Sequence, residues 1–188
     1  MMIVKQRRQA PAAHPPPLNL KLEISMAEPA WMAVARALIG VRETPGPANT
    51  PRIMKWAADL GPKILGILYP DDATPWCGLF TAHCINAVGV KTPAIAVRAS
   101  AWATWGVPVT PRLGAVLVFM RPGGGHVGFY VAQDATAFHV LGGNQGDAVS
   151  ITRIAKDRVV ACRWPAGVPS LTGPVLLTAG GAVSQNEA

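Results

Sequence analysis

The chain has 188 residues, a net charge of +7 and 50% apolar residues, so it is long enough to bury the core of one domain. Only 14% of its residues are charged, which excludes a highly charged disordered chain. The 19 glycines and 18 prolines favour a loop-rich mixed fold over a helical bundle, and the sequence has no run of about 18 apolar residues that would span a membrane.

Residues 1–28 are expected to form a flexible N-terminal tail. They contain the run Pro15, Pro16 and Pro17, which favours an extended chain. The segment 1–8 is basic but lacks the apolar stretch that a secretory signal needs. We therefore expect the protein to be made in the cytoplasm without a signal peptide, and to leave it, if at all, by another route.

Four helical segments are expected between this tail and residue 105. In the first, apolar residues recur at helical spacing between Pro29, a favoured first-turn residue, and Gly40, a favoured terminating residue. Gly61 and Gly89 are expected to end the second and third helices in the same way. The expected ranges are 29–40, 51–60, 74–88 and 99–105.

After Pro111 the sequence changes to short segments rich in Val, Ile, Phe and Tyr, separated by Gly, Pro or Asp. Five such segments in succession predict a meandering antiparallel sheet. The expected strands are 115–120, 126–132, 137–141, 149–154 and 159–164. Helices followed by strands indicate an α+β fold. We expect one domain over 29–165 and a flexible C-terminal tail over 166–188.

Cys77 is the candidate nucleophile, because it lies in the first turn of a predicted helix. The N–H groups and partial positive charge of a helix N-terminus favour the thiolate and can bind a developing oxyanion. The alternative interpretation is a small buried core residue. Three cysteines cannot all pair with one another, so free thiols are expected, with Cys84 and Cys162 in the core.

A cysteine nucleophile needs a histidine placed on another element as its base. His126 is the best candidate, because it opens a predicted strand directly after three glycines that let the backbone approach a substrate closely. His14 lies in the tail. His83 is six residues beyond Cys77 on the same helix and faces away from it. The alternative for His126 is a structural residue at the entrance of a hairpin.

A third polar group should orient the imidazole. Asn144 or Gln145, just past the next strand, would return beside His126 if the two strands form a hairpin. Asn144 is the leading candidate, and His139, nearer the hairpin turn, is its rival. Asn144 could instead be a turn residue that tolerates left-handed backbone geometry.

Several other classes of site are not expected. The sequence has no C-x-x-C or H-E-x-x-H spacing, so we expect no metal. No phosphate-binding loop is present, and no cofactor is expected. The basic residues of the domain are spread singly, without the motifs of nucleic-acid-binding modules, so nucleic acid is not an expected partner.

Three motifs together resemble the CHAP and NlpC-type cysteine hydrolases of bacterial and phage cell-wall metabolism. They are Pro75-Trp76-Cys77 opening a helix, Gly125-His126-Val127-Gly128-Phe129 opening a strand, and Gly142-Gly143-Asn144-Gln145 after the next strand. The resemblance spans about residues 29–165. It implies a papain-like fold, in which the helix that begins at the nucleophile packs on a roughly five-stranded antiparallel sheet.

The same resemblance assigns roles to individual residues. It implies that Cys77 is the nucleophile, that His126 is the general base and that Asn144 holds the imidazole. NlpC-type enzymes often have a histidine as the third member, near where His139 falls. Among substrate contacts, Gly125 allows close approach, and Trp76 forms a cleft wall or a core anchor. Trp102 lies on a segment that borders the groove in the family, but the favoured interpretation of Trp102 itself is a structural role.

The resemblance implies a monomeric, cysteine-dependent peptidoglycan hydrolase, an amidase or endopeptidase, of phage or prophage origin. It would reach the cell wall through holin-mediated release or as part of a virion. The net charge of +7 suits an anionic partner such as the cell wall. The alternative is a non-catalytic wall- or glycan-binding module, or a virion structural part, on the same scaffold.

Overall fold

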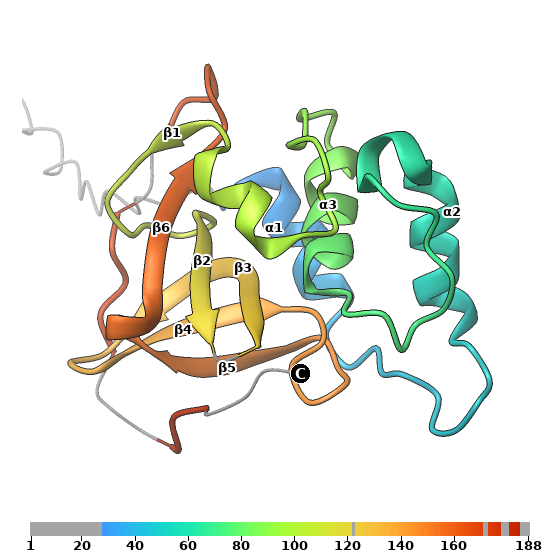
Figure 1. The fold of residues 1–188 in the computed structure, drawn as a ribbon. Coiled ribbons are helices and arrows are strands. Elements are labelled where there is room, and N and C mark those ends of the chain that lie inside the picture. Colours follow the sequence, from blue (N-terminus) through green and yellow to red (C-terminus); the bar gives the residue numbers. More distant parts are fainter. Residues whose placement is uncertain (1–27, 122, 171–172, 178–180, 185–188) are drawn as a thin grey trace, which may run out of the picture.

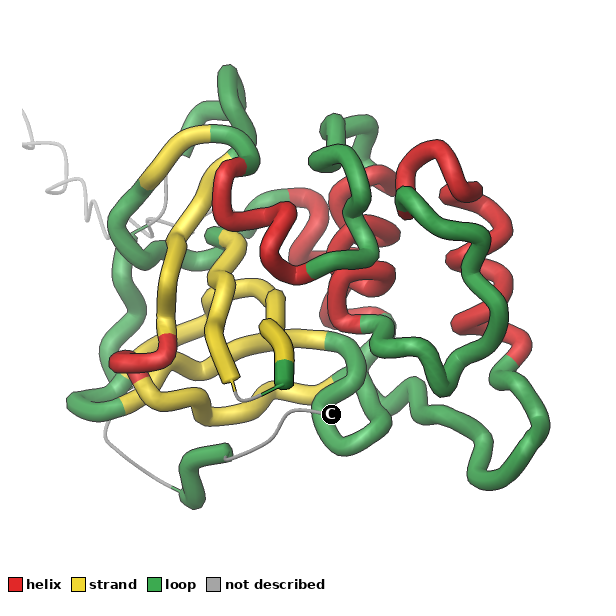
Figure 2. The backbone as a smooth tube through the Cα atoms, in the orientation of Figure 1, coloured by secondary structure: helices red, strands yellow, loops and turns green. Residues whose placement is uncertain are grey.

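The structure, a computed structural model, describes residues 28–121, 123–170, 173–177 and 181–184. It is an α+β fold with one six-stranded antiparallel sheet. The α-helices lie together on one side of the molecule and the strands on the other (Figures 1 and 2). The helices are α1 (Ala30–Ala37), α2 (Pro51–Leu65), α3 (Cys77–Ala87) and the 3₁₀ segments η1 (Ala99–Thr104) and η2 (Lys156–Arg158).

The helices begin and end close to the expected positions. Gly61 interrupts α2 with φ 70° and ψ 169°, so the helix expected to stop there does break before a short helical turn follows. Gly89 has φ 74° just beyond α3, as a terminating glycine requires. Almost every residue of α3 is buried, because the helix lies between α2 and the sheet.

The sheet has the strand order β1-β6-β2-β3-β4-β5. The strands are β1 (Val107–Pro108), β2 (Val116–Arg121), β3 (Gly124–Gln133), β4 (Ala137–Gly142), β5 (Ser150–Ala155) and β6 (Val159–Trp164). The five expected strands are all present. The sixth, β1, has only two residues, too few to give an alternating pattern in the sequence.

The meander holds only for β2 to β5, because β6 returns to pair with β2. A three-residue link, η2, joins β5 at the edge to β6, so the sheet must be strongly curled to bring them together. Arg158 in this link donates to the backbone oxygen of Met120 on β2 at 3.2 Å. Figure 1 shows β4 and β5 crossing below β2 and β3.

The described parts of the segment expected as a C-terminal tail make hydrogen bonds to the sheet. Gln133 at the end of β3 exchanges backbone hydrogen bonds with Val175 and Leu177, both at 2.8 Å. Ser184 donates to the backbone oxygen of Arg153 on β5 at 2.7 Å.

Residues 1–27, expected as the N-terminal tail, lie outside the described residues. Within the described ranges, no helix has the length and apolar character needed to cross a bilayer.

Candidate active site

Cys77 is the first residue of α3, and its side chain is 6% exposed. The residue before it, Trp76, caps the helix without a side-chain hydrogen bond, so no side chain at the cap occupies the N–H groups of the first turn. In Figure 1 this end of α3 faces the end of β4 and the loop that follows. The sulfur is therefore held at the junction between the helices and the sheet.

The backbone N–H groups of Val127 and Gly78 lie close enough to the Cys77 sulfur to lower the pKa of its thiol. Because Val127 follows His126 directly, this contact places the thiol beside the start of β3. Burial raises the pKa of the thiol, and this is the largest influence on it. The N–H groups and the positive charge of Arg121 act in the opposite direction but do not outweigh burial. In the free protein the thiol form is therefore favoured, contrary to the expectation from helix position alone.

His126 is the third residue of β3 and is 2% exposed. Its Nε2 lies 3.0 Å from Oε1 of Gln145, in the loop between β4 and β5. On the other side its ring lies against Phe119 of the neighbouring strand, with centroids 6.3 Å apart. Packing and a hydrogen bond thus fix the orientation of the imidazole.

The amide of Gln145 is itself fixed by the backbone of two strands. Its Nε2 donates to the carbonyl oxygen of Ser150 at 2.6 Å and to that of Val140 at 3.3 Å. Rotating the amide by 180° would turn Oε1 toward these two carbonyl oxygens, which cannot donate. The oxygen must therefore face His126.

This arrangement selects one tautomer of the neutral histidine. Because Gln145 offers an oxygen, His126 must carry its proton on Nε2 and donate it. The other ring nitrogen, Nδ1, is then the basic one. The side chain that holds the imidazole in this structure is thus Gln145, the neighbour of the leading candidate, Asn144.

Asn144 and His139 have other surroundings. Asn144 is buried and has φ 56°, a left-handed conformation that asparagine tolerates better than most residues. His139 donates through Nε2 to Asp134 at 2.9 Å, near the β3–β4 turn. Neither makes the hydrogen bond to His126 Nε2 that the third member was expected to make.

Two glycines allow the β4–β5 loop to come this close. A Cβ on Gly142 would lie 2.8 Å from Gln145 Oε1 and 3.0 Å from His126 Nε2. A Cβ on Gly143 would lie 2.6 Å from the ring of Trp76 and 2.5 Å from Phe80 Cβ. The Gly-Gly pair before Asn144 is therefore the sequence signal that the following side chains enter a crowded site.

A cavity of about 720 Å³ lies alongside this group of residues. Its wall combines η1, the end of β2 and the start of β3 with the residues just before α3. Its lining includes Pro75, Arg98, Ser100, Met120, Arg121 and Gly125. Pro75 is two residues before Cys77, and Gly125 precedes His126, so the cavity wall adjoins the segments that carry the thiol and the imidazole.

Of the three predicted substrate contacts, only Gly125 lines this cavity. Trp76 is fully buried, and its Nε1 donates to the carboxylate of Glu43. Trp102 is also fully buried and donates to the backbone oxygen of Ala96 at 2.9 Å. Both tryptophans therefore occupy the core, the structural alternative that the sequence had left open.

The remaining histidine and cysteine candidates lie away from the site. His83 stacks on Trp56 with ring centroids 5.1 Å apart. Cys84 is fully buried in α3, Cys162 is half-buried on β6, and all three cysteines are free. Among the described residues, no group of three or more His, Cys, Asp or Glu side chains is arranged to hold a metal ion.

The site thus holds a thiol at a helix N-terminus, a histidine whose Nε2 faces an amide oxygen, and a cavity that adjoins the segments carrying both. Such a set can transfer an acyl group to sulfur.

Compared with known proteins, the chain matches no protein-family model and no curated protein.

Proposed function

We propose that the protein is a cysteine-dependent hydrolase that cleaves amide bonds in bacterial peptidoglycan, on a papain-like scaffold. The observation that carries the proposal is the hydrogen-bonded series from Ser150 and Val140 through Gln145 to His126. The Cys77 thiol lies beside Val127, the next residue of β3. The choice of peptidoglycan as substrate is supported by the motif resemblance and by the basic charge.

In the proposed reaction, Nδ1 of His126 takes the proton from the Cys77 sulfur, and the sulfur attacks the carbonyl carbon of the scissile amide. The oxyanion that forms is stabilised by N–H groups at the start of α3. His126 then gives its proton to the leaving amine, and the C–N bond breaks. A thioester remains on Cys77, and water activated by His126 hydrolyses it to release the acid.

Gln145 acts through His126 in this scheme. Its oxygen keeps the ring proton on Nε2 and stabilises the imidazolium that forms when Nδ1 is protonated. An amide is well suited to this role, because its neutral oxygen holds the ring in place without placing a second charge beside it.

The test is the release of soluble fragments from purified peptidoglycan by the full chain. We expect Cys77→Ala to reduce the rate by a factor on the order of 10⁴ or more, to the background. Cys84→Ala is the matched control, since it makes the same change two turns further along the same buried helix and costs about 1 kcal/mol of stability. Equal lysis by the wild type and Cys77→Ala would overturn the cysteine mechanism.

A further inference from the structure

The charged residues that line this cavity are all positive. Two of its lining residues, Arg98 and Arg121, carry guanidinium groups, and no Asp or Glu is among the described residues that line it. Most of the rest of the wall is apolar or glycine. A cationic, largely apolar cavity of this kind favours an anionic group attached to an uncharged body.

Arg98 lies at the start of η1, and its side chain is exposed. Its backbone is held on both sides, because its N–H donates to Ile95 and its carbonyl oxygen accepts from Ala101, at 3.0 Å and 3.1 Å. Its guanidinium makes no hydrogen bond or ion pair with any other residue that the structure describes. The Arg98 guanidinium is therefore held at the cavity by a fixed backbone, and no described residue neutralises its charge.

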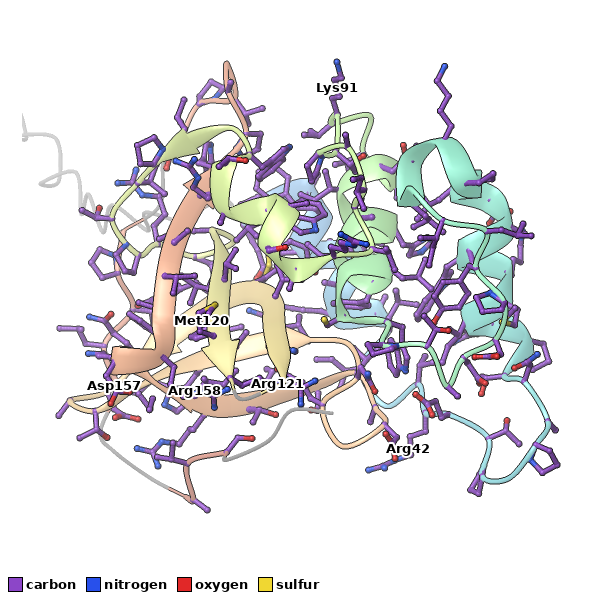
Figure 3. All side chains as sticks on the ribbon, viewed as in Figure 1. Arg42, Lys91, Met120, Arg121, Asp157 and Arg158 are labelled. Carbon is purple, nitrogen blue, oxygen red and sulfur yellow. The ribbon has the colours of Figure 1, made fainter. Side chains whose placement is uncertain are left out.

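Arg121 brings a second positive charge close to the reacting atoms. It ends β2, where the turn to β3 begins, and Figure 3 shows it there beside Met120. Its charge lowers the pKa of the Cys77 thiol, so the guanidinium field reaches the sulfur. The two arginines thus line one cavity, whose wall also includes Pro75 and Gly125, close in sequence to Cys77 and His126.

We propose that this cavity binds a peptide substrate with a free carboxylate near the scissile amide, and that Arg98 is the main contact of that carboxylate. The inference rests on the proposed function and narrows its substrate class to acidic peptides. Stem peptides of peptidoglycan belong to this class when their carboxyl groups are not amidated. Arg121 adds to the positive potential, and the apolar walls receive the uncharged part of the chain.

Ser100 allows the electrostatic part of the proposal to be tested without removing an arginine. Its side chain is exposed on η1 and lines the same cavity. Ser100→Glu adds a negative charge to the wall, whereas Ser100→Gln adds nearly the same volume without charge. Both changes are made at an exposed position, where substitutions are usually well tolerated.

The experiment measures binding separately from cleavage. The inactive Cys77→Ala protein is titrated at low ionic strength with a stem peptide carrying free carboxylates and with its fully amidated counterpart. We expect the amidated peptide to bind roughly tenfold more weakly, since a charge-assisted hydrogen bond is lost. Adding Arg98→Gln or Ser100→Glu should remove most of this difference. Ser100→Gln should preserve it, as should Arg52→Gln on the exposed N-terminus of α2.

Equal affinity for the two peptides, or no binding of either, would overturn the proposal. A difference that persists in full in Arg98→Gln would also overturn it, because the carboxylate would then be bound elsewhere. Failure of the proposed function gives a different result. In that case the two peptides still differ in affinity and Arg98→Gln still removes most of that difference, but the wild type releases no soluble fragments from peptidoglycan.

Discussion

His126 and His139 lie on the two strands of one hairpin, and their surroundings show how similar residues acquire different roles. His126 is near the start of β3, whereas His139 pairs with Ala132 near its other end. Six residues of extended strand separate 126 from 132, a distance of roughly 20 Å. His126 contacts a neutral amide beside a thiol and a cavity, while His139 contacts a carboxylate that is already paired with an arginine.

The carboxylate of Asp134 is fully engaged at the β3–β4 turn. Its Oδ1 accepts from the backbone N–H groups of Thr136 and Ala137, at 2.9 Å and 3.0 Å. Its Oδ2 accepts from Arg153 at 2.8 Å as well as from His139. These bonds, led by that from Arg153, hold the pKa of Asp134 well below its usual range. The cluster joins β3, β4 and β5 and contributes to stability, whereas we propose that the His126 group transfers protons.

The largest expected difference between the two regions concerns Gln145 and activity. Replacing Gln145 by Ala removes the oxygen that fixes the tautomer of His126, and we expect kcat to fall on the order of 10²-fold. Asn144→Gly is the control, because glycine keeps the left-handed backbone and removes the side chain. Peptidoglycan hydrolysis kinetics of both variants provide the measurement. A large loss in Asn144→Gly with an active Gln145→Ala would assign the role to Asn144 instead.

The opposite pattern is expected for Asp134. Asp134→Asn should lower the midpoint of thermal unfolding by roughly 5–10 °C, since an amide cannot accept all of these hydrogen bonds. The activity of the folded protein should stay within about twofold of the wild type. Calorimetry and initial rates below the transition check the two statements. A selective loss of kcat without loss of stability would place Asp134 in the reaction.

The pH dependence of stability gives a second test of this cluster. Because the pKa of Asp134 is depressed by folding, its stabilising effect is complete above the unfolded value of about 4 and is lost as the pH falls through the lower folded value. The difference in unfolding midpoint between the wild type and Asp134→Asn should therefore shrink between about pH 5 and pH 2. A difference that stays constant over this range would mean that Asp134 is not ionised in the folded protein.

The smallest effect is expected for His139. His139→Gln retains a donor that can reach Asp134, so the unfolding midpoint should change by about 2 °C or less. Its hydrolysis rate should equal that of the wild type, because His139 lies far along the strand from His126. A rate reduced tenfold or more would restore His139 as the third member of the site.

The elements of the fold followed largely from local sequence signals. Glycines marked the helix ends, and β-branched and aromatic runs marked five strands. The curl of the sheet was not predictable in this way, because it depends on pairing between β6 and β2, which are distant in sequence. The two-residue strand β1 gave no periodic signal.

The candidate site was predictable to the level of the segments that meet there. Spacing indicated that the residues after β4 return to His126, but it could not choose between Asn144 and Gln145. Gln145, and not Asn144, contacts His126 for two reasons. Asn144 adopts a left-handed conformation, and carbonyl groups of β4 and β5 orient the Gln145 amide. The cavity was not predicted, because Arg98 and Arg121 come together only through packing of η1 against the sheet.

The central claim is that the Cys77 thiol and His126 act as one acid–base pair. Alkylation of Cys77 by iodoacetamide, followed by mass spectrometry on the full chain, tests this most directly, with the deeply buried Cys84 as an internal reference. At neutral pH we expect Cys77 to react much faster than Cys84, and His126→Ala to slow its alkylation roughly tenfold or more. An unchanged alkylation rate at Cys77 in the folded His126→Ala protein would contradict the account.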